Sequence, residues 1–326
     1  MFDIVMPLFN KEAYVGEAIE SVLAQTYRDW NLIIVDDGSA DGSVAAVGRF
    51  RDERIRILSQ DNAGPGMARN TGIAAGEANW IALLDADDAW LPSHLATLND
   101  LRVEFPHAAL VGAAFTYWTG YLRPVSGPVR PGTRRLIRYF REVADANACF
   151  YTSSVAVSRA AIGQAGMFKA AKVGEDTELW ARLALHGPIA VSTSLTALYR
   201  VETGGLIDQN TSGKRAPDPM PATIGQVSLA LRTLETRLDD VTDPGLRKDI
   251  SDYIDYEIGV ALLRAVRLGR IDLARRLLTL FRSGPRGKAR IAARLARLPA
   301  PVGQLLMGLI LSGKKMARAI VRPKIA

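Results

Sequence analysis

The stretch Trp80-Ile81-Ala82-Leu83-Leu84-Asp85-Ala86-Asp87-Asp88 decides the fold, because an apolar run of strand length ends in three carboxylates. Such a run predicts a strand that delivers acids to the edge of a sheet. Neighbouring carboxylates repel one another, so we expect a divalent cation or a cationic partner to neutralise them. Oxygen ligands favour Mg2+ or Mn2+, which fill their other positions with water and phosphate oxygens. A solvated acidic turn is the alternative for such a motif on its own.

A second apolar run, 31–35, also ends in carboxylates, Asp36 and Asp37. The same reading predicts strands at 3–7, 31–35, 55–58 and 80–84, and helices at 15–23, 43–50 and 67–75, with Asn10 as a helix N-cap. This alternation predicts an α/β fold, a mostly parallel sheet with helices on both faces. Ligands of such sheets bind beyond the carboxyl ends of the strands, so both acidic groups should converge on one crevice.

The middle of the chain continues the pattern less clearly. The spacing predicts a helix at 92–104, a strand at 109–115, a loop at 120–132, a helix with a basic face at 133–143, a strand at 153–158 and a helix from Gly174 onward. Asp176 lies in the first turn of that last helix. An acid there can serve as a cap or dipole partner without any chemistry.

Composition bounds the class of protein. The chain has 326 residues and 48% hydrophobic content, enough for one large core and an appendage. Its one cysteine, Cys149, excludes an internal disulfide and a multi-cysteine zinc site, and its three histidines form no spaced metal pair. The N-terminus lacks the basic start and apolar core of a signal peptide, so we expect it to be the first strand.

Charge and composition also divide the chain. Residues 1–259 hold 25 Lys and Arg against 33 Asp and Glu, whereas residues 260–326 hold 16 against one, Asp272. A proline-rich linker at 213–221 separates an α/β domain, 1–215, from a helical region, 216–326. The helical region should contain helices at 224–238, 246–268 and 273–281, with Gly269 as a stop and Asp272 as a new cap.

The last segment combines arginines and lysines with apolar residues. Its apolar run 302–311 is too short to span a bilayer, and Lys314 and Lys315 follow it. This composition predicts a tail that lies in a membrane interface among anionic headgroups. A nucleic-acid partner is the alternative, although the basic helices carry few aromatic side chains for base stacking.

Several motifs in order resemble the family 2 glycosyltransferases, inverting nucleotide-sugar enzymes with the GT-A fold. The motifs are Val5-Met6-Pro7-Leu8-Phe9-Asn10, Gln25-Thr26-Tyr27, Val35-Asp36-Asp37-Gly38-Ser39-Ala40-Asp41-Gly42, Ala68-Arg69-Asn70-Thr71-Gly72, Leu84-Asp85-Ala86-Asp87-Asp88 and Gly174-Glu175-Asp176 with Leu179 and Arg182. The resemblance covers about two thirds of the chain and fades near Asn210. No Gln-x-x-Arg-Trp motif of the processive synthases is present.

The resemblance implies a role for each matching residue. The nucleotide-sugar site would comprise Pro7, Phe9, Asp37, Arg69, Asn70, Asp85, Asp87 and Arg200. The family pattern places the metal at Asp87 and Asp88 and makes Asp176 the general base. Arg200 would clamp the diphosphate, with an ordinary surface arginine as the alternative.

Taken together, the resemblance implies a non-processive, metal-dependent hexosyltransferase. It would move a sugar from a nucleotide-diphosphate sugar, expected to be UDP-linked, to a saccharide or lipid-linked acceptor. We expect it to serve surface polysaccharide or glycolipid assembly at the inner face of the cell membrane, without nucleic acid. A sugar-1-phosphate nucleotidyltransferase is the alternative enzyme, but residues 7–11 lack the Gly-rich, Arg-bearing loop of that class.

Overall fold

The computed structural model describes residues 1–118, 132–145, 150–171, 173–201, 221, 223–286 and 288–298. The chain forms two compact units: Met1–Glu142 with Ala146–Ala216, and Val143–Asp145 with Pro217–Ala326. Most of the predicted loop at 120–132 lies outside the described residues. So do the predicted interfacial run at 302–311 and the two lysines that follow it.

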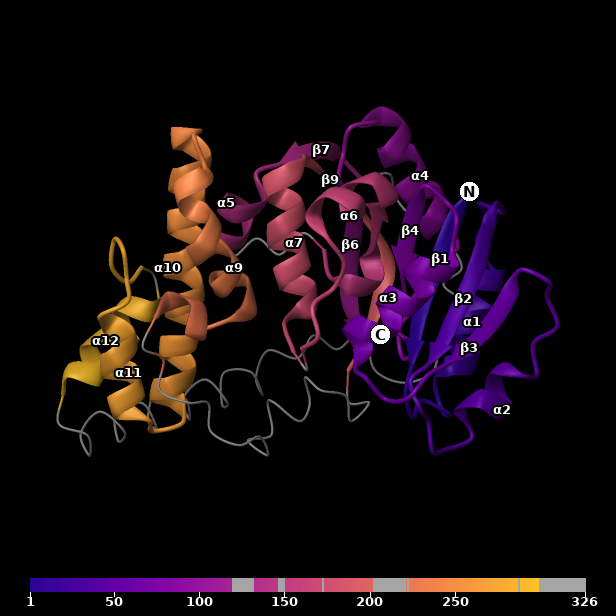
Figure 1. Ribbon diagram of the computed structural model, residues 1–326, viewed down its shortest axis with the longest axis horizontal. Coiled ribbons are helices and arrows are strands. Elements are labelled where there is room, and N and C mark those ends of the chain that lie inside the picture. The colour runs from indigo at the N-terminus through magenta and orange to yellow at the C-terminus, as the bar shows by residue number, and fades with distance from the viewer. Residues whose placement is uncertain are drawn as a thin grey trace, which may run out of the picture. The chain divides into compact units, whose positions relative to one another are not determined.

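The first four long strands of the first unit form a parallel sheet. These are β1 (Phe2–Leu8), β2 (Trp30–Asp36), β3 (Ile55–Ser59) and β4 (Trp80–Leu83), paired in the order β3-β2-β1-β4. Each strand agrees with its predicted position to within one residue at either end. Figure 1 shows β1, β2 and β3 side by side. β1, β2 and β4 are almost entirely buried, as expected for strands covered by helices on both faces.

Helices connect these parallel strands, at the predicted places. They are α1 (Val15–Leu23), α2 (Ser43–Val47) and α3 (Pro65–Ala75). Helix α3 packs very closely on the sheet, because a Cβ on Gly72 would come within 2.5 Å of Cγ1 of Val5. The predicted N-cap was wrong. Asn10 has a φ of 50°, and its side chain accepts a hydrogen bond from the backbone N of Ala40, so it shapes a loop instead.

The other half of the sheet is mixed. It contains β5 (Ala89–Trp90), β6 (Leu110–Trp118), β7 (Arg134–Ile137), β8 (Val155–Ser158) and β9 (Ile189–Arg200). Strand β8 runs antiparallel between β4 and β6, and β6 pairs with β9 in parallel. The described sheet therefore follows the order β3-β2-β1-β4-β8-β6-β9-β5, with β7 on β9. It is an α/β fold with a large sheet, as predicted, but strand β9 was not predicted.

The predicted helix at 133–143 was wrong. Residues 134–137 form β7, which pairs antiparallel with β9, and only α5 (Tyr139–Ala144) is helical. The residues 134–137 read as helix because two arginines precede two apolar residues. β9 offers them unpaired backbone groups, and hydrogen bonding to a strand edge overrides a weak helical pattern.

Further helices complete the first unit. They are α4 (His94–Glu104), η1 (Thr152–Ser154), α6 (Arg159–Ala165) and α7 (Glu175–His186). Gly174 precedes α7 with a φ of 83°, a conformation that glycine adopts without strain. The predicted strand at 153–158 is divided, because its first residues form η1 and only 155–158 form β8.

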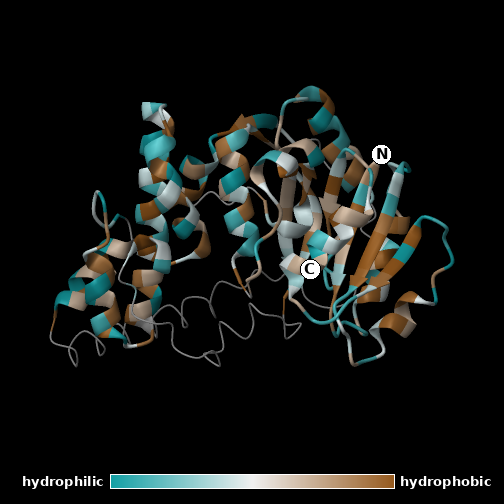
Figure 2. Cartoon of the chain, in the orientation of Figure 1, coloured by the Kyte–Doolittle hydropathy of each residue, from teal (hydrophilic) through white to brown (hydrophobic). Residues whose placement is uncertain are grey.

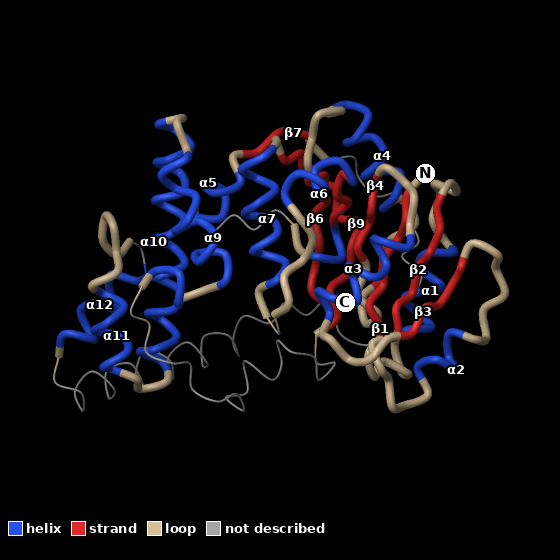
Figure 3. The backbone as a smooth tube through the Cα atoms, in the orientation of Figure 1, coloured by secondary structure: helices blue, strands red, loops and turns tan. Residues whose placement is uncertain are grey.

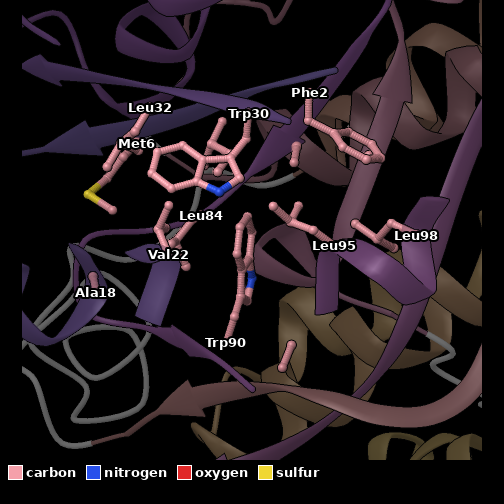
Figure 4. Packing of buried hydrophobic residues seen from close by; sticks show 14 of the residues in the cluster. Phe2, Met6, Ala18, Val22, Trp30, Leu32, Leu84, Trp90, Leu95 and Leu98 are labelled. Atoms are coloured by element: carbon pink, nitrogen blue, oxygen red, sulfur yellow. The ribbon is translucent and has the colours of Figure 1, made fainter. Parts of the chain in front are cut away.

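The main core of this unit lies between β1, β2, α1 and α4. Figure 4 shows the indole rings of Trp30 and Trp90 at its centre, with Val22 and Leu84 on one side and Leu95 on the other. All five side chains are at most 2% exposed. Burial of each side chain of this size contributes on the order of 2 kcal/mol to the free energy of folding. This packing stabilises the sheet whose edge carries the acids.

The second unit is helical among its described residues (Figure 3). It contains η2 (Ile224–Gln226), α9 (Leu229–Arg237), η3 (Leu238–Asp240), α10 (Pro244–Arg267), α11 (Ile271–Leu278) and α12 (Lys288–Arg297). Gly269 ends α10 with a φ of 72°, as predicted, but Arg270 rather than Asp272 is the N-cap of α11. Figure 2 shows hydrophilic and hydrophobic residues alternating around α11 and α12. No helix in the described ranges is long and apolar enough to cross a membrane.

Candidate active site

Parallel strands bring the acids to one edge of the sheet. The register aligns Leu8 with Asp36 and Val5 with Leu83, so β1, β2 and β4 end close together. The residues directly after these strands include Asp37 and the cluster Asp85, Asp87 and Asp88. This register brings Asp37 and the cluster after β4 to the same edge of the sheet, as expected.

Asp37 organises the loop that leads into α3. Its carboxylate accepts hydrogen bonds from Nε2 of Gln60 at 2.7 Å and from the backbone N of Ala63 and Gly64 at 2.9 and 2.8 Å. The side chain is 3% exposed. Asp37 therefore positions the chain before α3, and any contact with a nucleotide base would use its remaining acceptor capacity.

Arg69 joins the acid cluster to α7. Its guanidinium donates to Oδ1 of Asp85 at 2.6 Å and to Oε1 of Glu175 at 2.8 Å, and its side chain is 4% exposed. Burial opposes the charge on Arg69, but the two carboxylates more than offset it, so its pKa lies above the ordinary value. The Arg69 bridge, as we call Asp85, Arg69 and Glu175, links two segments far apart in sequence.

Asp87 has a cationic partner. Its Oδ2 lies 2.6 Å from Nζ of Lys11, which follows β1, and both side chains are 17% exposed. Its backbone oxygen accepts from Nε of Arg200 at 3.0 Å. A divalent cation or a cationic partner was expected to neutralise the acid cluster. Among the described residues, the side chains of Lys11 and Arg69 are such cationic partners.

Asp88 differs from its neighbours because it is buried, at 2% exposure. Its two carboxylate oxygens accept from Oγ of Ser153 at 2.5 Å and from the backbone N of Arg200 at 2.9 Å. Burial and the charges of Asp85 and Asp87 raise its pKa well above the ordinary value. Asp88 therefore fastens the loop after β4 to η1 and to the end of β9.

Asp176 lies half-buried in the first turn of α7. Its Oδ2 accepts from Oγ1 of Thr152 at 2.8 Å, and its Oδ1 accepts from the backbone N of Thr177 at 2.7 Å. The neighbouring Glu175 is buried, and this burial raises its pKa although Arg69 opposes the shift. The Arg69 bridge thus holds the residue next to Asp176 at the acid cluster.

The segment before α7 is held by two polar clamps. The amide of Asn70 donates to the backbone O of Phe168 at 2.8 Å and accepts from its backbone N at 2.9 Å. Arg182 donates to the buried Glu178 and to the backbone oxygens of Gly166 and Met167. Asn70, predicted near the sugar, therefore uses its amide to fix the backbone.

Arg200 is not a surface arginine. It is 6% exposed, its Nη2 lies 2.5 Å from Oε2 of Glu17, and its guanidinium lies 3.9 Å from the centroid of the Trp118 ring. Of the other two predicted residues, Pro7 is partly buried in β1, and Phe9 is 46% exposed just beyond it. Phe9 directly follows Leu8, whose backbone oxygen accepts from the backbone N of Asp37, and its exposed aromatic ring suits a stacking role.

A divalent ion was predicted at Asp87 and Asp88. The described residues contain no group of three or more His, Cys, Asp or Glu side chains arranged to hold a metal ion. The donor chemistry nevertheless fits one at Asp87, because carboxylates suit Mg2+ or Mn2+ and the ion would take its other ligands from water and phosphate. Asp88 fits poorly, since both its oxygens already accept hydrogen bonds from buried groups.

Sequence reasoning missed several residues of this edge. Lys11, Thr152, Ser153 and Glu175 all contact a predicted site residue. Glu175 stood inside a quoted motif but received no role. Ser153 and Thr152 carry no sequence signal, because they reach the site only through the pairing of β8 with β4 and β6.

Comparison with known structures agrees with this fold. The structure of S. aureus TarS 1–349 in complex with UDP-GlcNAc superposes with a TM-score of 0.67 at 15% identity, over 94% of this chain and 88% of that one. The mannosyltransferase PcManGT from Pyrobaculum calidifontis, in complex with GDP-Man and Mn2+, gives a TM-score of 0.50 at 17% identity over 94% and 86%. The architecture is that of the GT-A glycosyltransferases.

Sequence comparison gives shorter but closer matches. The Escherichia coli UDP-Glc:alpha-D-GlcNAc-diphosphoundecaprenol beta-1,3-glucosyltransferase WfgD is 40% identical over 96 residues, 29% of this chain and 38% of WfgD. The glycosyltransferase GlyG of Streptococcus pneumoniae is 32% identical over 36% of this chain and 40% of GlyG. The succinoglycan biosynthesis protein ExoW of Rhizobium meliloti is 39% identical over 31% and 34%. The chain thus spans less than half the length of these curated relatives.

The family model of glycosyl transferase family 2 matches residues 3–152, which include β1 to β4 and the acid cluster. This match contains all but two of the predicted site residues, Asp176 and Arg200. Residues 3–152 are therefore similar to glycosyl transferase family 2, and the relatives that match part of the chain include glycosyltransferases.

Proposed function

We propose that the first unit is a non-processive, inverting glycosyltransferase. It would transfer a sugar from a nucleotide-diphosphate sugar, with UDP as the expected nucleotide, to an acceptor hydroxyl. The observation that carries this proposal is the Arg69 bridge. One buried guanidinium bonds Asp85, at the edge where the donor is expected, and Glu175, the neighbour of Asp176.

Asp176 has the surroundings of a general base. Thr152 and the backbone N of Thr177 orient its carboxylate, which remains partly exposed. It would take the proton of the acceptor hydroxyl while the acceptor oxygen forms a bond to the anomeric carbon. The bond from that carbon to the diphosphate oxygen breaks on the opposite face, so the configuration inverts and the nucleotide diphosphate leaves.

The donor would lie against the loops after β1, β2 and β4. Phe9 would stack on the base, Asp37 would accept from it, and Asp85 would bind the ribose or sugar beside Arg69. Asp87 would hold Mg2+ or Mn2+, which neutralises charge on the leaving diphosphate when bound. Arg200 would act by fixing Asp87 and Asp88, because its own charge is already paired with Glu17.

The relatives suggest the acceptor class. The name of WfgD specifies a diphosphoundecaprenol-linked acceptor, and ExoW is named for succinoglycan biosynthesis. We infer a saccharide or lipid-linked acceptor and a role in surface polysaccharide or glycolipid assembly. Such an acceptor requires access to a membrane, and on α12 the exposed Ile291 and Arg290 suit an anionic surface.

A nucleotide panel tests the donor site. Thermal shift with UDP, GDP, CDP and TDP, with and without Mn2+, should raise the melting temperature for one nucleotide, most strongly with the metal, because a ligand of the native state stabilises it. Proton NMR of the product formed from that sugar donor should show an anomeric configuration opposite to that of the donor. No shift with any nucleotide would refute the donor assignment.

Co-sedimentation tests the membrane proposal separately. The full chain should sediment with phosphatidylglycerol vesicles and remain in solution with phosphatidylcholine vesicles, because the basic C-terminal segment seeks anionic headgroups. A chain truncated after Gly284 should sediment with neither. Equal binding of the full and truncated chains to the anionic vesicles would assign the basic segment to packing within the second unit.

A further inference from the structure

Four aromatic side chains form a closed ring of contacts at the ends of β6 and β9. They are Phe115, Tyr117, Tyr151 and Tyr199, here called the aromatic quartet. Ring centroids are 5.7 Å apart for Phe115 and Tyr117, and 5.6 Å apart for Tyr117 and Tyr199. The other two pairs, Tyr199 with Tyr151 and Tyr151 with Phe115, are 5.0 and 4.5 Å apart.

The sheet explains why these rings meet. Phe115 and Tyr117 are two positions apart on β6 and so lie on one face. The parallel register places Tyr117 directly opposite Tyr199 on β9. Tyr151 reaches the same face from the residue before η1. The hydroxyl of Tyr151 is buried, but Tyr117 is exposed and Tyr199 partly exposed, so this face combines apolar ring planes with the polar edges of two tyrosines.

This quartet differs from the aromatic residues of the core. Trp30 and Trp90 are 2% exposed, whereas Tyr117 is 69% exposed although its ring contacts two others, those of Phe115 and Tyr199. Because its neighbours already restrict this exposed ring, a ligand that binds it causes a smaller loss of side-chain conformational entropy, which favours binding. Phe115 and Tyr151 also pack against the main core, whereas the exposed ring of Tyr117 belongs neither to the core nor to the donor site described above.

The quartet borders the candidate active site. Tyr151 immediately precedes Thr152, which donates to Asp176. Tyr151 also lies near the acid cluster, since it stands two residues before Ser153, whose hydroxyl donates to Oδ2 of Asp88. An acceptor must present a hydroxyl to Asp176, so a surface beside Thr152 is where its sugar ring would have to lie.

We propose that the aromatic quartet binds a pyranose ring of the acceptor and holds one of its hydroxyls toward Asp176. A pyranose ring has apolar C–H faces, which pack on aromatic planes, and a rim of hydroxyls, which match the tyrosine hydroxyls. A polyprenyl chain would call for aliphatic side chains without polar edges. This inference rests on the proposed function, because it assumes that Asp176 is the base.

Saturation-transfer NMR with methyl glycosides tests the site directly. Methyl β-glucoside, methyl β-galactoside and methyl N-acetyl-β-glucosaminide would each be added at millimolar concentration to the full chain in the presence of UDP. We expect transfer to the ring protons of at least one glycoside. It should fall at least about tenfold in Tyr117→Ala and persist in Tyr117→Phe, because loss of the ring removes the stacking surface.

The matched control is Val103→Ala on α4, since Val103 is also 69% exposed and should leave the transfer unchanged. The inference is overturned if the wild-type chain gives no transfer to any glycoside, or if Tyr117→Ala equals the wild type. Decyl phosphate, added in the same way, probes binding of a polyprenyl chain instead of a sugar. The inference is also overturned if Tyr117→Ala abolishes binding of decyl phosphate and leaves binding of the glycosides unaffected. Calorimetry with UDP separates this inference from the proposed function. Tyr117→Ala should bind UDP with the affinity of the wild type. A wild-type chain that binds UDP but no glycoside would refute the acceptor site at the aromatic quartet and leave the donor site standing.

Discussion

Arg69 and Glu175 form a buried ion pair of 2.8 Å although they are 106 positions apart in sequence. The pair connects α3, which follows the donor loops, to the first turn of α7. Because Arg69 also bonds Asp85, the geometry of the acid cluster and that of Asp176 depend on the same side chain.

Replacing Arg69 tests this dependence. Arg69→Met should destabilise the first unit by about 3–5 kcal/mol, because it leaves two carboxylates without their buried partner. Glu175→Gln should cost less, since Arg69 keeps Asp85. Urea denaturation followed by tryptophan fluorescence suits the measurement, because all five tryptophans belong to the first unit. Arg134→Met is the control, as its exposed pairs with Asp100 and Glu104 should contribute less than about 1 kcal/mol.

Asp87 and Asp88 should respond differently to amidation. Asp87→Asn should remove the Mn2+ dependence of UDP binding in calorimetry, because it takes away the charged ligand. Asp88→Asn should keep that dependence but lose about 1–3 kcal/mol of stability, since its new amide group faces donors from Ser153 and Arg200. If Asp88→Asn abolishes the Mn2+ dependence and Asp87→Asn retains it, the ion belongs at Asp88.

Asp176→Asn separates a base from a helix cap. The amide oxygen can still accept a hydrogen bond from Thr152 or the backbone N of Thr177, so the melting temperature and UDP affinity should stay unchanged. Turnover should fall by roughly 10²-fold or more, because the proton acceptor is gone. Asp100→Asn on the exposed side of α4 serves as the control. Near-normal turnover of Asp176→Asn would leave Asp176 a structural residue.

The pH dependence of stability should contain a contribution from His94. This residue is fully buried, its Nδ1 lies 2.8 Å from Oγ1 of Thr196, and burial lowers its pKa to about 3. The folded state keeps the ring neutral, whereas the unfolded chain takes up a proton below about pH 6.5. Stability from this group is therefore complete above pH 6.5 and is lost as the pH falls toward 3.

A matched variant isolates that contribution. Between pH 7.5 and 5.5, protonation of His94 in the unfolded chain should cost the wild type about 1.4 kcal/mol of unfolding free energy. The double variant His94→Phe with Thr196→Val removes both partners of the buried hydrogen bond and should lack that part of the loss. Thr196→Val alone should retain it. Equal pH dependence in the wild type and the double variant would mean that the folded protein also protonates His94.

The sequence predicted the parallel half of the sheet well for a physical reason. Strands such as 31–35 are buried on both faces, so each is a continuous apolar run that ends in a polar residue. Strand β9 escaped prediction because serines and threonines interrupt its apolar residues, so it lacks the continuous apolar run that marks 31–35. Arginines of β7 looked helical because their pairing partner, β9, was unknown.

Some residues of the candidate site could be placed from the sequence, and others could not. Asp37, Asp85 and Asp87 follow apolar strands and could be placed at one edge from the sequence. The roles of Asp88 and Asn70 could not be foreseen, because they depend on the distant partners Ser153 and Phe168. Equally, no local pattern reveals that Arg200 is covered by Trp118.

The ion pair between Lys11 and Asp87 has a consequence for how an ion would enter. Since the ammonium group of Lys11 already neutralises Asp87, we expect the chain to stay folded when a chelator removes divalent ions. Loading would then be an exchange in which Lys11 gives way. Affinity for the ion would rise when an incoming diphosphate offers Lys11 a new anion, so the nucleotide and the metal would each favour the binding of the other.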